Sequence, residues 1–182
     1  MKIQDLRLAL TAIPKKTDIR YYLNGVKITK DTVSASNGNI LCHINTYQNE
    51  LPDINDYLIV PVETIKALLK KMGSKHDNKE VSIFLNNGRY ELQCLNEVEV
   101  FTPIDGKYPS FDKILTPVKV NNHDENLNKI LHQFDWSYVA LANDAICKYY
   151  GTTTPKRLYS CAECGYFMPD NDIIYVIMPC RN

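Results

Sequence analysis

Two cysteines in the segment CAECG have the spacing of a metal-binding or redox pair. Cys161 and Cys164 are separated by two residues, as in structural zinc sites and thiol redox centres. A structural zinc ion needs four ligands, and a redox pair normally lies beside a βαβ pattern that this sequence lacks. Further zinc ligands would have to converge from Cys147, Cys180 or His132. We therefore expect no cofactor and keep the pair only as an incomplete zinc candidate, since two buried thiols with a bend at Gly165 are the simpler interpretation.

The usual arrangements of catalytic residues do not occur in this sequence. It has no glycine-rich phosphate loop, no HExxH motif and no nucleophile elbow. His43 alternates with apolar residues of an expected strand, and the other histidines lie in or beside polar segments: His76, His123 and His132. A general base needs a partner within hydrogen-bond reach, and the spacing identifies none. We predict that the protein is not an enzyme.

Composition indicates a folded protein with no overall electrostatic preference. The 182 residues include 21 Lys and Arg and 21 Asp and Glu, so a nucleic-acid surface would have to arise from local clusters. The amino-terminal stretch MKIQDLRLALTAIPKK alternates apolar and charged residues, and no window approaches the ~20 apolar residues of a membrane span. We expect a cytoplasmic protein with no membrane contact, whose six cysteines remain reduced.

Hydrophobic periodicity divides the chain into three repeats of a helix followed by antiparallel strands, which indicates an α+β fold. Ile3, Leu6, Leu10 and Ile13 have helical spacing, and Pro14 stops that helix. The second expected helix lies between Pro61 and Gly73, and the third runs from the N-cap Asp135 to Gly151. The expected strands cover residues 20–28, 32–36, 40–44, 57–60, 80–86, 89–95, 97–104, 157–163 and 173–179.

Five segments in order carry a family resemblance: DIRYYLNGVKI, SNGNIL, IVPVETIKALLKKM, FTPIDGKYPSFDKILTP and YVIMPCRN. They resemble segments of the bacterial DNA polymerase III β subunit, the sliding clamp. The ordered set is far more specific than any one segment. The resemblance implies the DNA clamp fold, made of repeated helix-plus-antiparallel-strand units, with about three half-domain units in this chain. It also implies a processivity factor of DNA replication.

The resemblance divides the chain into a complete domain and half of another. Residues 1–117 resemble the complete middle domain of the clamp with its two half units, and residues 118–126 form a linker. Residues 127–182 resemble the last half of the third domain, in which FDWSYVALANDAI is similar to the helix. The terminal IIYVIMPCRN then provides the last strand and a tail that forms one wall of a pocket.

In the family, the seam between these two parts binds short linear motifs of DNA polymerases, clamp loader and repair proteins. The resemblance assigns this peptide-binding pocket to Leu23, Ser36, Gly38, Asn39, Ile40, Leu41, Pro109, Lys113, Ile114, Asp135, Tyr138, Val176, Ile177, Met178, Pro179, Cys180 and Arg181. The sequence departs from the family at Asn39 and Ile40, where His and Arg are typical. It also departs at Cys180 and Asn182, where Met and Leu are common. Without the resemblance, the apolar members are typical of ordinary core residues.

A clamp lines its hole with basic helices that attract DNA phosphates without sequence preference. The residues that the chain offers for this role are Lys2, Arg7, Lys15, Lys16, Arg20, Tyr21, Tyr22, Lys66, Lys70, Lys71 and Lys75. In the third expected helix, Asp144 offsets Lys148, so that helix does not contribute. The alternative for the lysines is a solvated helix face.

The number of half-domain units leaves two assemblies open. A chain with about three units would close a family-sized ring around double-stranded DNA only as a homotetramer. The competing interpretation, which the missing segments favour, is a monomer or dimer that binds protein partners without encircling DNA. Such a protein would act as an adaptor, a decoy or an inhibitor carried by a mobile element. A third hypothesis is a zinc- or thiol-dependent module built on Cys161 and Cys164.

Overall fold

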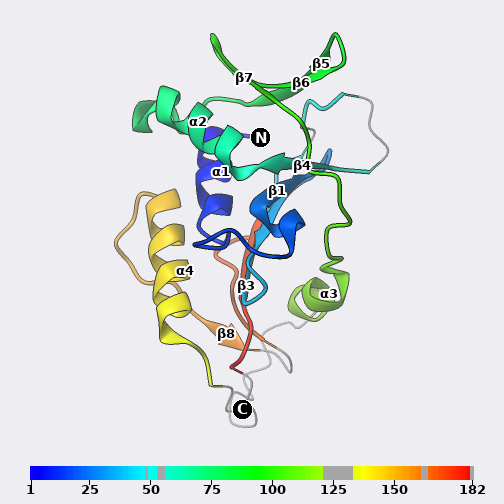
Figure 1. Ribbon diagram of the computed structural model, residues 1–182. Coiled ribbons are helices and arrows are strands. Elements are labelled where there is room, and N and C mark those ends of the chain that lie inside the picture. The colour runs from blue at the N-terminus through cyan, green and yellow to red at the C-terminus, as the bar shows by residue number, and fades with distance from the viewer. Residues whose placement is uncertain (48, 53–55, 121–132, 161–163, 181–182) are drawn as a thin grey trace.

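The structure is a computed structural model that describes residues 1–47, 49–52, 56–120, 133–160 and 164–180. Its helices pack against two antiparallel sheets (Figure 1). The expected α+β class is therefore confirmed. No helix in these described ranges has the length and apolar character needed to cross a membrane.

Helix α1 (Ile3–Leu10) is the amphipathic helix expected at the start of the chain. Leu6 is fully buried, and the backbone N–H of Lys2 donates to the Asp5 carboxylate at 2.6 Å, which caps the first turn. The helix ends before Ile13, where the prediction placed its last apolar residue. The reason is that the two N–H groups after the helix bond three residues back instead of four, which tightens the chain into turns.

Helix α2 (Val62–Met72) follows strand β4 (Leu58–Pro61) without a loop. Ile65 and Leu68 are fully buried, and the lysines lie on the opposite, exposed face. Gly73 ends the helix with a φ of 61°, a conformation that favours glycine. Both predicted ends of this helix are confirmed.

The seven-stranded sheet joins the first and last parts of the chain. Strand β10 pairs antiparallel with β3, and Val176 lies opposite Leu41. This pairing places the carboxyl-terminal strand directly beside the first repeat. The strand order is β4-β1-β2-β3-β10-β9-β8, with β1 (Gly25–Ile28), β2 (Thr32–Ser36), β3 (Ile40–Asn45), β8 (Tyr159–Ser160), β9 (Gly165–Phe167) and β10 (Ile173–Ile177).

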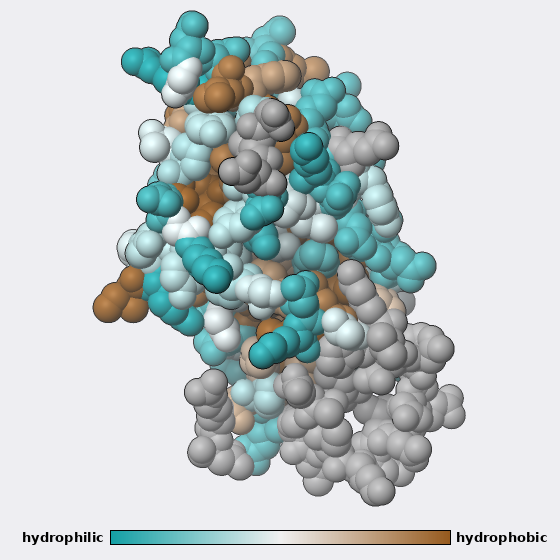
Figure 2. Space-filling view, turned by 90° about the vertical axis from the view of Figure 1, so that its right-hand side faces the viewer, coloured by the Kyte–Doolittle hydropathy of each residue, from teal (hydrophilic) through white to brown (hydrophobic). Residues whose placement is uncertain are grey.

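The second sheet has three strands, β5 (Ser82–Asn86), β6 (Arg89–Cys94) and β7 (Glu97–Phe101). Figure 2 shows hydrophobic side chains among hydrophilic ones over this sheet, at the top of the molecule. Val100 is 56% exposed there, and Phe84 is 39% exposed. The outer face of this sheet is therefore incompletely covered within one chain.

Two apolar cores lie on the two faces of the seven-stranded sheet. Helices α1, α2 and α4 (Trp136–Tyr149) contribute to the larger core, together with residues such as Cys42 and Tyr175. The smaller core contains Leu41 and Val176 with two residues of the α3 region, Phe111 and Leu115. Because strand residues alternate between faces, neighbouring residues of β3 and β10 belong to different cores. In Figure 1, α4 and α3 accordingly lie on opposite sides of the sheet.

Several predicted boundaries are wrong. Residues 20–28 begin with a 3₁₀ turn, Tyr21–Asn24, before β1, because the Asn24 side chain bonds the backbone of Asp18 and folds this segment back. Strand 80–86 begins only at Ser82 and strand 97–104 ends at Phe101. Strand 157–163 begins only at Tyr159, in β8, and its predicted end at 161–163 lies outside the described residues.

Gly165 does not form the expected bend. It lies in β9, a strand that was not predicted, and pairs with Ile177 of β10. A Cβ at this position would lie 2.9 Å from the ring of Phe134. Glycine is therefore required here by the close approach of an aromatic ring to the backbone.

Helix α3 (Asp112–Val120) was not predicted either. Its sequence signal is Phe111 and Leu115, which have i,i+4 spacing and are both buried. The helix extends through residues 118–120, which the prediction assigned to a linker. The remainder of that segment, and residues 127–132 of the expected half domain, lie outside the described residues.

Candidate functional site

The turn between β2 and β3 is held rigidly by its own polar side chains. The Asn37 carboxamide oxygen accepts from the backbone N–H of Asn39 at 2.9 Å and of Ile40 at 3.0 Å. The Ser36 hydroxyl donates to the Ile40 carbonyl at 2.7 Å and accepts from the N–H of Gly38 at 3.0 Å. Gly38 has a φ of 90°, which an L-residue rarely adopts. The turn therefore presents its backbone in one defined geometry.

Helix α4 begins beside this turn. Asp135 is its N-cap, as predicted, and accepts from the backbone N–H of Ser137 at 2.8 Å. These hydrogen bonds to Ser137, together with the nearby positive charge of Lys15, lower the pKa of the Asp135 carboxyl. One turn into the helix, the Tyr138 hydroxyl accepts from the carboxamide of Asn39 at 3.3 Å. The first turn of α4 is thereby linked to the β2–β3 turn.

The chain segment after β10 completes the arrangement. The backbone N–H of Met178 donates to the carbonyl of Asn39 at 2.8 Å. The N–H of Cys180 donates to the carbonyl of Gln133 at 2.7 Å. Residues 178–180, called the tail below, are therefore held between the β2–β3 turn and the start of α4.

These three segments enclose a surface hollow of about 600 Å³. Met178, Pro179 and the ring of Tyr138 supply apolar surface, whereas Arg20 and Asp135 supply charge. The described residues that line it are Arg20, Gly38, Asn39, Asp135, Tyr138, Met178, Pro179 and Cys180. Such a combination of apolar walls and a few polar anchors suits an extended peptide.

Arg20 is a member of this hollow that sequence reasoning placed elsewhere, among the DNA-facing residues. Its guanidinium donates to the Asp18 carboxylate at 3.0 and 2.8 Å and to the Asn37 carbonyl at 3.1 Å. Hydrogen bonding and the charge of Arg20 lower the pKa of Asp18 to about 2. A Cβ on Gly38 would lie 2.6 Å from the guanidinium. The absence of a side chain at Gly38 therefore lets Arg20 lie over the turn.

The other predicted pocket residues fall into three groups. Leu23, Leu41 and Val176 are at most 3% exposed and belong to the smaller core, so they lie in the interior and do not line the hollow. Ser36, Ile40 and Ile177 are also buried. Pro109 precedes α3, whereas Lys113 and Ile114 belong to it; Ile114 packs against the smaller core, and none of the three lines the hollow. Arg181 lies outside the described residues.

Comparison with known proteins is consistent with this architecture. No family model matches the sequence. The β sliding clamp of Chlamydia muridarum is 24% identical over 139 residues, which cover 72% of this chain and 37% of that protein. The β sliding clamp of Chlamydia pneumoniae is 23% identical over 125 residues, which cover 65% of this chain and 33% of that protein. The chain thus spans about a third of the length of the curated relatives it matches.

Solved structures give the decisive similarity. A DNA polymerase III β subunit from Eubacterium rectale superposes with a TM-score of 0.69 at 13% identity, covering 99% of this chain and 63% of that one. The DNA polymerase sliding clamp from Pseudomonas aeruginosa gives 0.65 at 17% identity, covering 100% and 66%. This chain has the DNA clamp fold. The resemblance found in the sequence is confirmed at the level of fold.

Several of the basic residues proposed for the DNA side of this clamp fold are engaged in ion pairs. Arg7 donates to Asp77 at 2.7 Å, and Lys66 lies 3.0 Å from Glu63. Lys71 lies 2.8 Å from Glu99 and 3.6 Å from Glu97. Lys15, Lys16, Lys70 and Lys75 are exposed. Of the two tyrosines, Tyr21 is exposed and Tyr22 is half-buried against the ring of Tyr108.

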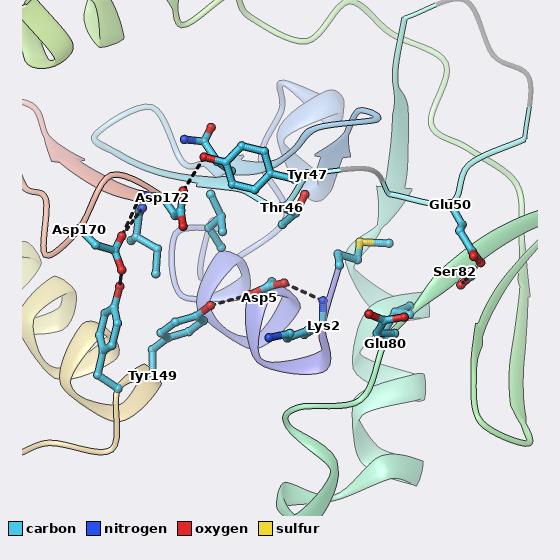
Figure 3. Close-up of a pocket in the computed structure, with 16 residues that line it drawn as sticks. Lys2, Asp5, Thr46, Tyr47, Glu50, Glu80, Ser82, Tyr149, Asp170 and Asp172 are labelled. Atoms are coloured by element: carbon cyan, nitrogen blue, oxygen red, sulfur yellow. Dashed lines mark hydrogen bonds between the residues drawn. The ribbon is translucent and has the colours of Figure 1, made fainter.

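Lys2 lies in surroundings that oppose phosphate binding. It lines a second hollow of about 380 Å³ together with five carboxylates, of Asp5, Glu50, Glu80, Asp170 and Asp172 (Figure 3). Tyr149 of α4 donates to Asp5 of α1 at 2.8 Å, and Tyr47 donates to Asp172 at 2.7 Å. The hydrogen bond to Asp172 also raises the pKa of Tyr47. We interpret these tyrosine–carboxylate bonds as a connection between the first and last parts of this clamp fold.

Only one member of the cysteine pair, Cys164, lies in the described part of the chain. Cys164 is buried in the smaller core, whereas Cys161 and His132 lie outside the described residues. Within the described residues, His, Cys, Asp and Glu form no group of three or more that could hold a metal ion. Burial also raises the pKa of the Cys42 thiol.

Proposed function

We propose that this clamp-fold chain is a non-catalytic accessory of DNA replication or repair that binds short linear motifs of its protein partners. The binding site is the hollow formed by the β2–β3 turn, the first turn of α4 and the tail. The observation that carries the proposal is the convergence of these three segments on one hollow, held by the Met178–Asn39 and Cys180–Gln133 backbone bonds. Partners would be a DNA polymerase, a clamp loader or a repair protein. One sliding clamp of the same fold, from Bartonella birtlesii, has been solved bound to griselimycin, at 17% identity to this chain.

The chemistry of the hollow favours a peptide with large apolar anchors and polar backbone contacts. Met178 and Tyr138 offer apolar contact surface, and the guanidinium of Arg20 offers N–H donors to a peptide carbonyl. Two buried anchors would contribute ~1.5–3 kcal/mol each. The two anchors alone therefore supply less than the ~8 kcal/mol of micromolar affinity, and the polar contacts must supply the remainder and the cost of ordering the peptide, so we expect micromolar rather than nanomolar binding. Exchange between competing partners requires an affinity in this range.

A peptide titration tests the proposal. A fluorescein-labelled peptide containing Gln followed by Leu and Phe should bind saturably, with a dissociation constant of roughly 1–100 μM by fluorescence anisotropy. Tyr138→Ala should weaken binding by about 10-fold, because it removes an aromatic wall of the hollow. Trp136→Ala is the matched control, since Trp136 belongs to the same helix, is 74% exposed and does not line the hollow.

Two outcomes would contradict the proposal. The first is an absence of saturable binding at several hundred micromolar protein. The second is an equal loss of affinity in the Tyr138 and Trp136 variants. Substitution of Leu41 by a charged residue is unsuitable as a test, because Leu41 is only 3% exposed and a buried charge would unfold the chain.

A second candidate function is an adaptor or decoy that binds the same partners without encircling DNA. The ion pairs of Arg7 and Lys71 favour it, because each paired cation contributes less to phosphate attraction. The carboxylates around Lys2 act in the same direction. Two measurements separate the two functions. Light scattering gives the number of chains in the assembly, and a retention assay with a clamp loader compares binding to circular and to linearised DNA. A closed oligomer retained only on circular DNA supports encirclement, whereas a monomer or dimer without retention supports the adaptor.

A further inference from the structure

The hollow at the tail adjoins another hollow, and Tyr138 belongs to the wall between them. This neighbouring hollow, called the basic hollow below, has a volume of about 470 Å³ and shares Asn39 and Tyr138 with the first. The shared wall consists of an exposed Asn39 side chain and a half-buried Tyr138 ring, joined by one hydrogen bond of 3.3 Å. A single exposed hydrogen bond of this length is readily exchanged for bonds to a ligand.

The two hollows differ in charge. Arg20 and Asp135, of opposite sign, line the first hollow. Lys15 and Lys66 line the basic hollow, and none of the described residues that line it is a carboxylate. Lys66 is paired with Glu63, but the two side chains are 53% and 84% exposed, so solvent screens the pair and Lys66 can exchange partners.

The floor of the basic hollow is apolar. Leu10, Ile13 and Pro14 contribute from the end of α1 and the following turn, and Leu141 contributes from α4. A phosphate backbone gains nothing from contact with such a floor, because its binding depends on charge. A peptide segment that places an acidic side chain next to an apolar one complements both the floor and the two lysines.

We infer that the basic hollow extends the peptide site and selects partner segments that carry an acidic side chain beside an apolar residue. The carboxylate lies between Lys15 and Lys66, and the neighbouring side chain contacts Leu10, Ile13 and Leu141. The Asn39–Tyr138 bond opens as the peptide backbone passes from one hollow to the other. This inference rests on the proposed function and adds the charge preference of the ligand.

The test compares five labelled peptides, of which three are the neutral Gln-Leu-Phe peptide and two versions extended by Glu-Leu-Glu at the amino or the carboxyl end. Each extended peptide has a counterpart with Gln in place of Glu. One Glu peptide should bind about 3–10-fold more tightly than its Gln counterpart at low salt, as expected for two screened charge contacts. The difference should vanish in 0.5 M salt, where the screening length falls to a few ångströms.

Variants distinguish this inference from the proposed function. The double variant Lys15→Gln, Lys66→Gln should bind Glu and Gln peptides equally while retaining its affinity for the neutral peptide. Lys75→Gln is the control, because Lys75 is exposed and lines neither hollow. Equal affinities in the wild-type protein, or a preference that survives in the double variant, overturn this inference alone.

Two further results would also overturn it. If the neutral peptide does not bind at all, the proposed function and this inference fail together. If a 20-base-pair DNA duplex binds through Lys15 and Lys66 and no peptide shows a charge preference, the basic hollow serves phosphates instead of a carboxylate.

Discussion

Gly38 is needed for two reasons: its backbone has a positive φ, and Arg20 lies close above it. Comparing Gly38→Ala with Gly88→Ala separates the two. Gly38 and Gly88 both lie in hairpin turns with positive φ, at 90° and 77°. Alanine in such a conformation costs ~1–2 kcal/mol at either position. At Gly88 the added Cβ meets nothing within 4 Å, whereas at Gly38 it lies 2.6 Å from the Arg20 guanidinium. Only the Gly38 variant therefore has a steric conflict as well.

The size of the additional destabilisation in the Gly38 variant depends on the group that the new Cβ displaces. The guanidinium is the end of a flexible side chain, so the steric conflict costs about 1 kcal/mol, the lower end of the range for overpacking. We expect Gly38→Ala to lower the free energy of unfolding by ~2–3 kcal/mol and Gly88→Ala by ~1–2 kcal/mol. Displacement of Arg20 from the hollow should also weaken binding of the neutral peptide by roughly 5–10-fold, the value of one solvent-exposed hydrogen bond.

Urea denaturation measures the first effect, and fluorescence anisotropy measures the second. The m-values of the two variants should agree, so that the midpoints can be compared directly. If Gly38→Ala and Gly88→Ala are equally destabilised and bind the peptide equally well, Arg20 does not lie over Gly38 as described. A loss of affinity in both variants would also refute the reasoning, since Gly88 lies in the hairpin between β5 and β6, away from the hollow.

Two further predictions concern the acidic groups. Tyr149→Phe should lower the free energy of unfolding by ~1.5–3 kcal/mol, because it removes a hydrogen bond to the Asp5 carboxylate, which is only 4% exposed. Tyr47→Phe removes an exposed hydrogen bond and should leave the urea midpoint nearly unchanged. Equal effects of the two substitutions would contradict the difference in burial between these bonds. Asp18 should titrate near pH 2 by NMR, because Arg20 lowers its pKa. A lowered carboxyl pKa means that its stabilising effect is present above about pH 4 and is lost as the pH falls toward 2; a titration near pH 4 would show that the pair does not form in solution.

Hydrophobic periodicity was sufficient to predict the elements that bury one regular face. Helix α2 begins and ends where predicted, because its apolar positions repeat at helical spacing and Gly73 ends it. Strands β2 and β3 were predicted at nearly their observed bounds, because the Asn37-Gly38 turn separates two β-rich runs. In these elements the local sequence preference and the tertiary packing agree.

The missed elements depend on contacts between distant parts of the chain. Strand β9 has only three residues, and it is defined by pairing with β8 and β10. Gly165 was therefore interpreted as a bend, although the glycine is required by the ring of Phe134. Arg20 was grouped with the DNA-facing residues. Its actual position over Gly38 depends on the turn geometry and on its hydrogen bond to Asp18, which the sequence does not show. Sequence spacing contains neither of these contacts.

For the proposed pocket, the sequence predicted some of the lining residues but not which residues are buried. The family resemblance identified Asn39, Tyr138 and Met178, which do line one hollow. It could not show that Leu23 and Leu41 lie beneath the surface, because an apolar strand residue has the same sequence signal in a core as in a groove. Burial had to be read from the structure.

Amide chemical-shift mapping with the neutral peptide tests the central claim most directly. The backbone N–H groups of Asn39, Met178 and Cys180 all form hydrogen bonds within the segments that enclose the hollow. We predict that their signals shift together along one saturable curve, and that the signals of Lys2 and Asp5, which line the separate hollow with five carboxylates, remain unchanged. Unchanged Asn39, Met178 and Cys180 signals at saturating peptide, or shifts concentrated around Lys2 and Asp5, would contradict the account.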